Sequence, residues 1–399
     1  MQTVTTTEDL AAFCQRAADA PYVTIDTEFL RERSYYAKLC LLQLAIPGPE
    51  GPETGDAVLV DPIAGDLSLE PLYDLLRDAS TVKVLHAARQ DLEIFYIEGR
   101  ALPQPLFDTQ IAAMVCGFGE QVGYETLVRK LAKASLDKTS RFTDWSRRPL
   151  SDAQKAYALA DVTHLRVIYE QLSQRLSETG RHAWVEEELA VLTDPATYVV
   201  RPDEAWRRIR TRSGSPRFLA VVQALARFRE EYAQSRNIPR SRVMKDDALL
   251  ELASTRPTSM DELGRARLLL REARRGEVAE GILAAVREAL ALPGEALPKP
   301  DTDRAQLNVN PALADLLRVL LKSKAEEAGV AQKLIASAEE LDALAAGRRD
   351  VAALKGWRKQ LFGADALRLC NGEIALSARG ASVRIIPVPD CDSARPAAR

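Results

Sequence analysis

Cysteine is scarce in this chain, whose 399 residues include only five, and no two of them are spaced as CxxC. A scattered, odd number of cysteines favours neither a disulfide framework nor a zinc finger. Long apolar runs are also missing, because charged residues interrupt them well before the ~18 residues that a membrane helix needs. Residues 1–13 lack a basic stretch followed by an apolar one. We therefore expect no membrane span, no export signal and a reducing, cytoplasmic location.

Composition and charge are those of an ordinary globular protein, with 46% hydrophobic and 28% charged residues. At about 150 residues per domain, the length suggests two or three domains. The chain as a whole has a net charge of −3, but residues 201–280 carry 18 Lys and Arg against 12 Asp and Glu. This local excess of positive charge lies where a polyanion such as a nucleic acid could bind.

The first half of the chain alternates predicted strands with predicted helices, which indicates an α/β fold. Apolar, β-branched runs between turn residues predict strands at Tyr22–Ile25, Leu39–Ala45, Ala57–Val60 and Thr81–Leu85. Helical spacing of apolar residues predicts helices at Glu8–Ala18, Leu69–Arg77, Gln90–Ile97, Thr109–Val115, Tyr124–Leu131 and Ser151–Thr179. From about residue 195 the strand signal almost disappears, so an all-α region is predicted to follow.

An internal repeat divides the helical half. Residues 237–253 align with residues 329–345 without a gap at an offset of 92, and the matching positions are mostly apolar. We interpret this as a duplicated helical unit, although two amphipathic helices can also match by chance. Residues 293–300 are rich in proline and read as a linker. The predicted domains are 1–195, 200–292 and 305–390.

Two carboxylates, Asp26 and Glu28, follow the apolar run Val23–Ile25. On a strand, side chains two positions apart point to the same face, so the two acids lie side by side and repel each other. A divalent cation between them would relieve the repulsion, because Mg²⁺ and Mn²⁺ prefer carboxylate oxygens. A solvated strand end is the alternative for this pair by itself.

Two further acids lie on predicted helices. Asp91 falls in the first turn of one, where a carboxylate also stabilises a helix without binding metal. Tyr157 and Asp161 are four residues apart on another and share a face, as in many amphipathic helices. Each segment has an ordinary explanation, and only their combination indicates a site.

In this order the segments resemble the three motifs of the DEDD superfamily of 3′–5′ exonucleases, and specifically the ribonuclease D family. Asp26 and Glu28 match the first motif, Asp91 the second and Asp161 the third. Tyr157, four residues before the last acid, matches the tyrosine branch of the superfamily. The neighbouring stretches that are similar are Ile25–Ala45, Leu85–Glu93, Phe107–Ala113 and Asp144–Leu165.

The resemblance also implies the architecture, which is a ribonuclease H-like mixed sheet in the exonuclease domain followed by two small helical HRDC-type domains. Residues 201–290 resemble an HRDC domain, which would bind phosphates through Arg and Lys with little sequence preference. Residues 309–388 resemble the second, more divergent HRDC-like domain of the family. Few basic residues occupy its middle, so we expect it to pack around the active site rather than bind directly.

Four carboxylates gathered from a strand and two helices would need two divalent ions, Mg²⁺ or Mn²⁺, about 3.5–4 Å apart, and such a pair hydrolyses phosphodiesters. A phenol normally titrates near pKa ~10, so we assign Tyr157 to orienting the attacking water rather than to acting as a base. Further contacts with the 3′ end are expected from residues that flank the motifs, with core packing as the alternative: Thr27, Phe29, Leu30, His86, Gln90, Lys138 and Trp145. We read Asp108 as a helix cap and His164 as a packing residue.

The resemblance implies a monomeric, metal-dependent 3′–5′ exoribonuclease that trims transfer RNA precursors and other structured RNAs and releases nucleoside 5′-monophosphates. The residues do not separate RNA from DNA, because a contact with the 2′-hydroxyl cannot be located in a sequence. A DNA exonuclease of the same mechanism therefore stays an alternative. A non-catalytic RNA-binding scaffold predicts the loss of an acid, yet all four are present. A protein-interaction platform would need apolar faces on the repeat.

Overall fold

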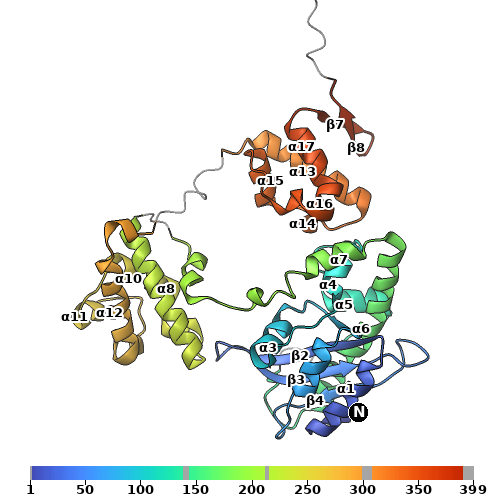
Figure 1. Ribbon diagram of the computed structural model, residues 1–399, viewed down its shortest axis with the longest axis horizontal. Coiled ribbons are helices and arrows are strands. Elements are labelled where there is room, and N and C mark those ends of the chain that lie inside the picture. Colours follow the sequence, from blue (N-terminus) through green and yellow to red (C-terminus); the bar gives the residue numbers. More distant parts are fainter. Residues whose placement is uncertain (1, 138–142, 212–214, 299–307, 390–399) are drawn as a thin grey trace, which may run out of the picture.

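A six-stranded mixed sheet forms the centre of the N-terminal half in the computed structural model, which describes residues 2–137, 143–211, 215–298 and 308–389 (Figure 1). The strand order is β1–β4–β3–β2–β5–β6. Strand β3 is antiparallel to both β2 and β4, whereas the other neighbours are parallel. The strands are β1(Gln2–Val4), β2(Tyr22–Leu30), β3(Lys38–Ala45), β4(Ala57–Val60), β5(Val82–Leu85) and β6(Leu106–Asp108).

Helices pack on this sheet along the apolar faces that their sequences predict. The longest of them, α6, contacts β2, β3, β4 and β5. It begins with a capping box between Ser151 and Gln154 and ends at Gly180, whose φ of 65° is left-handed. The helices of this half are α1(Thr7–Ala18), α2(Glu70–Arg77), α3(Arg89–Gly99), α4(Thr109–Val115), α5(Tyr124–Leu127), the π-helical turn η1(Val128–Ala132), α6(Asp152–Thr179) and α7(His182–Leu189).

Strand β2 differs most from its predicted bounds, because it runs five residues beyond Ile25 to Leu30. Strand β3 pairs with it through the acidic segment, with Asp26 opposite Gln43 and Glu28 opposite Leu41. The register shifts between Glu28 and Phe29, which marks a bulge. Backbone pairing with β3 therefore keeps the acids on a regular strand despite their low strand propensity.

A first helical unit follows and has its own core. Buried residues from α8, α10 and α12 form that core, and Tyr35 joins it from the hairpin between β2 and β3. Figure 1 shows this hairpin reaching from the sheet towards α8. The elements that follow α7 are η2(Pro195–Thr197), η3(Pro202–Arg208), α8(Pro216–Arg236), α9(Arg240–Val243), α10(Asp246–Thr255), α11(Met260–Gly264), η4(Glu272–Arg274), α12(Gly276–Ala291) and η5(Gly294–Ala296).

A second helical unit repeats the start of the first at the predicted offset. Helix α9 begins at Arg240 and α14 at Gln332, exactly the 92 residues by which the sequences align. The residues that end the preceding helices, Asn237 and Gly329, are both left-handed, with φ of 47° and 60°. The elements of the second unit are α13(Pro311–Ala328), α14(Gln332–Ile335), α15(Ala338–Ala345), η7(Ala352–Leu354), α16(Gly356–Arg358), η8(Lys359–Gly363), α17(Ala364–Cys370), β7(Ile374–Arg379) and β8(Ser382–Pro387).

The β7–β8 hairpin corrects the expectation that this region contains helices alone. Six residue pairs, from Ile374 with Pro387 to Arg379 with Ser382, join the two antiparallel strands. Most of their side chains are exposed, so the strands lack the apolar alternation by which a sequence reveals them. None of the described helices is long and apolar enough to cross a bilayer.

The second helical unit packs directly on the exonuclease half. The indole rings of Trp184 on α7 and Trp357 on α16 stack with centroids 4.5 Å apart. Arg358 forms an ion pair with Glu188 at 2.5 Å, and the amide of Ala331 donates to the carbonyl of Met114 at 3.2 Å. Buried residues of both parts consequently belong to one continuous hydrophobic core.

Candidate active site

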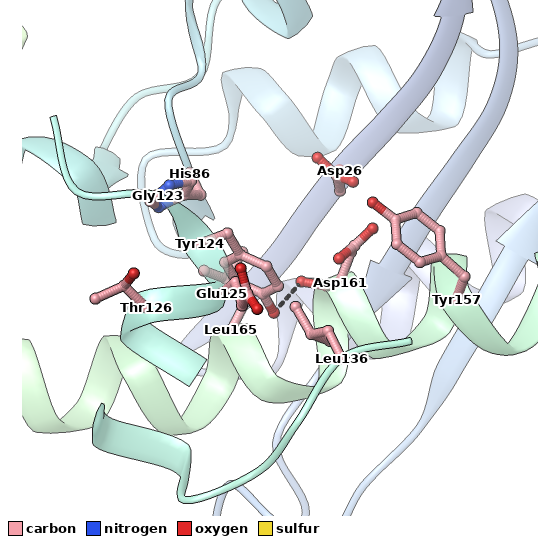
Figure 2. Close-up of a pocket in the computed structure, with 10 residues that line it drawn as sticks. All are labelled: Asp26, His86, Gly123, Tyr124, Glu125, Thr126, Leu136, Tyr157, Asp161 and Leu165. Atoms are coloured by element: carbon pink, nitrogen blue, oxygen red, sulfur yellow. Dashed lines mark hydrogen bonds between the residues drawn. The ribbon is translucent and has the colours of Figure 1, made fainter. Parts of the chain in front are cut away.

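Three of the four predicted acids meet at the middle of β2. Asp26 and Glu28 share a face of that strand, and α6 crosses the sheet there and brings Asp161. One carboxylate oxygen from each lies within 4.8 Å of the others, a spacing at which one cation can contact all three. Figure 2 shows Asp26 and Asp161 pointing into the same space, together with Tyr157.

The fourth acid, Asp91, lies in the first turn of α3 and is 6% exposed. Its carboxylate accepts a hydrogen bond from the hydroxyl of Thr27, the residue between the two acids of β2. Asp91 is outside the group of three whose oxygens lie within 4.8 Å, although its charge still acts on Asp26. Thr27 thus connects Asp91 to β2 and is itself buried, with 6% exposure.

Burial and repulsion between neighbouring charges favour protons on Asp26 and Asp91 when no cation is bound. Burial raises the pKa of Asp26 well above its ordinary value, and the charges of Asp161, Asp91 and Glu28 raise it further. Burial likewise raises the pKa of Asp91 to about 7, against the opposing hydrogen bond from Thr27. A partly buried, all-oxygen set of this kind fits Mg²⁺ or Mn²⁺, whose charge would offset the repulsion.

Tyr157 lies one helical turn before Asp161 and faces the same space (Figure 2). Burial raises the pKa of its hydroxyl, and the charges of Asp161, Glu28 and Asp26 add to the effect, as does a hydrogen bond to Asp161. The phenol therefore stays protonated across the physiological range and serves as a hydrogen-bonding group. It cannot serve as a base.

A cavity of about 260 Å³ adjoins the acids, and part of its wall was missed by the sequence analysis. That part comes from residues 123–126 and Leu136. Tyr124 stands out there because its hydroxyl donates to the carbonyl of Asp161 at 2.6 Å (Figure 2). In the sequence this segment reads only as the start of a helix, so no local pattern reveals that it faces the acids.

The predicted substrate contacts lie in different environments. His86 lines the cavity, contacts Tyr124 with ring centroids 5.4 Å apart and is within 2.9 Å of the hydroxyl of Thr109. Phe29 is half-buried and Gln90 is exposed at the start of α3.

Three of the predicted contacts lie away from this cavity or from the described structure. Leu30 lines a separate groove with residues of the β2–β3 hairpin. Trp145 is 2% exposed and packs 6.1 Å from the ring of Tyr157, so its indole supports Tyr157 and has no free face for a base. Lys138 lies outside the described residues.

Gln43 is a second residue that the sequence analysis missed. It is fully buried on β3 directly opposite Asp26, and paired residues on antiparallel strands share a face. Neither its amide nitrogen nor its amide oxygen has a hydrogen-bond partner. A buried amide without partners is costly, so its position beside the acids is unusual.

Asp108 is confirmed as a helix cap. Its carboxylate accepts from the amides of Gln110 and Ile111 at the start of α4, and also from those of Ala87 and Ala88. These four hydrogen bonds connect α4 to the loop before Asp91. Asp108 thereby helps to position the second motif without belonging to the acidic group.

Comparisons with known proteins agree with this geometry. The 3′-5′ exonuclease family matches residues 1–177, and the HRDC domain family matches residues 218–286. A protein of Jannaschia sp. (strain CCS1) named ribonuclease D is 63% identical over 386 residues, which cover 97% of this chain and 99% of that relative. A ribonuclease D of Granulibacter bethesdensis is 49% identical and covers 96% of each chain.

A solved structure is also similar over nearly the whole chain. The crystal structure of Escherichia coli RNase D, described as an exoribonuclease involved in structured RNA processing, superposes with a TM-score of 0.79. It is 32% identical and covers 93% of this chain and 98% of its own. The similarity therefore includes the exonuclease half and the helical units together.

Proposed function

The chain belongs to the ribonuclease D family and is a 3′–5′ exoribonuclease, and we propose that Asp26, Glu28, Asp91 and Asp161 are its metal ligands. The observation that carries this assignment is the convergence of Asp26, Glu28 and Asp161, whose oxygens lie within 4.8 Å of one another. Asp91 completes the set, because it accepts a hydrogen bond from Thr27 and its charge raises the pKa of Asp26.

Exonucleases of this family depend on metal, and we propose that the site takes two Mg²⁺ or Mn²⁺ ions. Four carboxylates carry enough negative charge for two divalent ions, and oxygen ligands suit both metals. When bound, the ions activate a water and stabilise the charge that develops on the reacting phosphate and on the leaving oxygen.

The residues of the chain hold and orient the reactants. Tyr157 stays neutral and is placed to hydrogen-bond the attacking water, since it faces Asp26 and Asp161 across the cavity. Attack by water on the terminal phosphorus forms a new P–O bond and breaks the bond to the 3′ oxygen of the preceding nucleotide. That oxygen takes up a proton, and a nucleoside 5′-monophosphate leaves.

We propose that its substrates are structured RNAs, with 3′-extended transfer RNA precursors as the principal class. Support comes from the similarity to the Escherichia coli enzyme, which is described as acting in structured RNA processing. The HRDC match at residues 218–286 adds a nucleic-acid-binding unit beside the exonuclease half. We further propose that the protein acts as a monomer in the cytoplasm, where the four described cysteines, all free, would stay reduced.

A time course tests this proposal with a 5′-labelled, 3′-extended transfer RNA precursor and a single-stranded DNA of matching sequence. Wild-type protein with Mg²⁺ or Mn²⁺ should shorten the RNA one nucleotide at a time and the DNA much more slowly. A chelator should stop both reactions. Equal or faster digestion of the DNA would contradict the proposed substrate class.

Matched variants test the site. Asp26→Asn and Asp161→Asn each remove one negative ligand at nearly constant volume and should reduce turnover by at least 10³-fold, with RNA binding retained. Tyr157→Phe removes only an orienting hydroxyl and should reduce turnover by ~10- to 100-fold, which corresponds to the loss of one hydrogen bond to a charged group. Asp74→Asn, which alters an exposed acid on α2 outside the acidic group, serves as the control and should keep most of the activity. Wild-type turnover in either acid variant would contradict the assignment.

A further inference from the structure

A second, smaller cavity lies between the exonuclease half and the first helical unit. Its volume is about 170 Å³, and four arginines line it: Arg31, Arg89, Arg208 and Arg240. They come from the β2–β3 hairpin, the start of α3, the end of η3 and the start of α9. Glu93 is the sole acidic residue among the described ones that line it. The wall is therefore strongly positive.

Carboxylates neutralise two of these arginines. Arg31 makes two hydrogen bonds with Glu93, at 2.6 and 2.8 Å. Arg240 makes two with Glu230, both at 2.6 Å. Arg89 and Arg208 are exposed, and within the part of the chain that the structure describes neither has an ion-pair partner. Two positive charges are thus left to attract an anion.

The wall of the cavity is held in place from both sides. The guanidinium of Arg240 lies over the ring of Tyr35 at 4.7 Å, and the hydroxyl of Tyr35 bonds to Glu230. The side-chain oxygen of Asn237 accepts from the backbone amide of Tyr35 at 3.1 Å. Gln234 donates to the carbonyl of Val200 at 2.9 Å, which also holds the segment between η2 and η3 in place. The sides of the wall that carry Arg31 and Arg240 are consequently arranged before any ligand arrives.

Two arginines of the cavity lie close in sequence to acids of the candidate active site. Arg31 follows directly after β2, three residues beyond Glu28, and Arg89 precedes Asp91 by two residues on α3. The same two elements, β2 and α3, therefore lead to arginines of the cavity and carry acids of the site that would hold the 3′ end. The cavity is smaller than the ~300 Å³ of typical small-molecule sites, so it suits a phosphate group better than a whole nucleotide.

We propose that this cavity binds one backbone phosphate of the RNA strand, a few nucleotides upstream of the cleaved bond. The guanidinium groups of Arg89 and Arg208 hold its oxygens, since Arg presents donors in a fork that matches phosphate. A phosphate bound there would hold the first helical unit and the exonuclease half to the same RNA strand. The proposal rests on the function proposed above, because it assumes that the 3′ end lies at Asp26 and Asp161.

A methylphosphonate scan tests the proposal. In a series of 12-nucleotide RNAs, each carries one uncharged methylphosphonate in place of one phosphate, and kcat/KM is measured for release of the first nucleotide. For the wild-type protein, a methylphosphonate at one upstream position should lower kcat/KM by ~5- to 20-fold. The variant Arg89→Ala/Arg208→Ala should show the same loss of kcat/KM on unmodified RNA. A methylphosphonate at that position should not lower its kcat/KM further. Its kcat/KM should also depend less steeply on salt, by about one to two phosphate contacts.

A charge-matched control uses Arg267→Ala/Arg271→Ala. These exposed arginines follow α11, which Figure 1 places on the side of the first helical unit away from the sheet. This control should keep the position-specific loss of the wild type. Arg89→Lys/Arg208→Lys keeps the positive charges but not the forked guanidinium donors, so it should give an intermediate loss of kcat/KM. Thermal unfolding of every variant verifies that it is folded.

Three outcomes would overturn the proposal or separate it from the proposed function. An identical methylphosphonate profile in wild type and Arg89→Ala/Arg208→Ala would show that no backbone phosphate binds here. Protection of the wild type from thermal unfolding by inorganic phosphate, lost in the variant and without a position-specific effect, would assign the cavity to a free anion instead. Failure of the wild type to hydrolyse even the unmodified 12-nucleotide RNA in the presence of metal would contradict the proposed function, on which this proposal rests.

Discussion

At the acidic site, protons and metal ions compete for the same oxygens. Burial raises the pKa of Asp91 to about 7 in the metal-free protein, and that of Asp26 is raised as well. A ligand carboxylate must lose its proton before it binds metal, so metal binding releases protons. The apparent affinity for metal should therefore fall as the pH drops through about 7.

This competition predicts that the Mg²⁺ concentration for half-maximal activity rises about 10-fold per pH unit below neutrality for each proton released. Titrations of activity with Mg²⁺ at several pH values between 6 and 8 measure it, and saturating metal should restore most of the rate at pH 6. A half-maximal concentration that stays constant over this range would contradict the raised pKa of Asp91.

Gln43 allows a second prediction about a single residue. Its amide is buried without a partner, which costs ~1–3 kcal/mol for such a group. Gln43→Met has a similar length and no amide, so it should raise the free energy of unfolding by about 1 kcal/mol or more. Chemical denaturation measures the change, with Gln43→Asn as the comparison that keeps an amide. A gain in stability together with a loss of hydrolysis would assign the amide to the site rather than to the fold.

Among the elements, the β2–β3 hairpin joins the sheet to the first helical unit through Glu230, which is 1% exposed. Burial alone would raise the pKa of Glu230, but hydrogen bonds from Arg240 and Tyr35 lower it below its ordinary value. A carboxyl group whose pKa is lower in the folded state stabilises the protein above its unfolded pKa of ~4.3. This contribution is lost as the pH falls through the folded value.

Glu230→Gln should therefore lower the free energy of unfolding at pH 7 by ~1–3 kcal/mol, and the difference from wild type should shrink as the pH falls below ~4.3. Glu231→Gln, which changes the exposed neighbour, is the matched control and should have little effect. Denaturant unfolding at pH 7 and pH 4 measures both variants. A difference that grows in acid would contradict the lowered pKa.

For the whole molecule, the second helical unit is docked by stacked indoles and a half-buried ion pair. The Arg358 and Glu188 side chains are 16% and 13% exposed. Removing Arg358 leaves the Glu188 carboxylate without this cation in a poorly solvated place, where the indole N–H of Trp357 still donates to it. Arg358→Ala should destabilise this contact by ~1–3 kcal/mol. Lys355→Ala, whose partner Asp350 is exposed, should cost less than ~1 kcal/mol.

Hydrogen exchange of α16 and small-angle scattering would report this contact. In Arg358→Ala the amides around Trp357 should exchange faster and the scattering should show a more extended particle, with the sheet unchanged. Equal protection in both variants would mean that the Trp184–Trp357 stack and the other contacts between the two parts hold the unit in place without this ion pair.

Local patterns in the sequence determined much of this protein. The bounds of β4 and α4, the Asp108 cap and the 92-residue repeat follow from periodicity and turn chemistry, which neighbouring residues encode by themselves. The motif spacing around Asp26, Asp91 and Asp161 is enough by itself to indicate the family of the chain. The roles of these acids as metal ligands stay a prediction.

Tertiary packing decided the rest. Tyr124 reached the acids, Trp145 was buried behind Tyr157, and Gln43 was left opposite Asp26 because distant segments fold onto the sheet. The exposed β7–β8 hairpin, and the arginine cavity assembled from four separate segments, likewise have no local signature. Neighbours along the chain determine which helices and strands form, whereas contacts between residues far apart in sequence depend on how those elements pack, and packing cannot be read from periodicity.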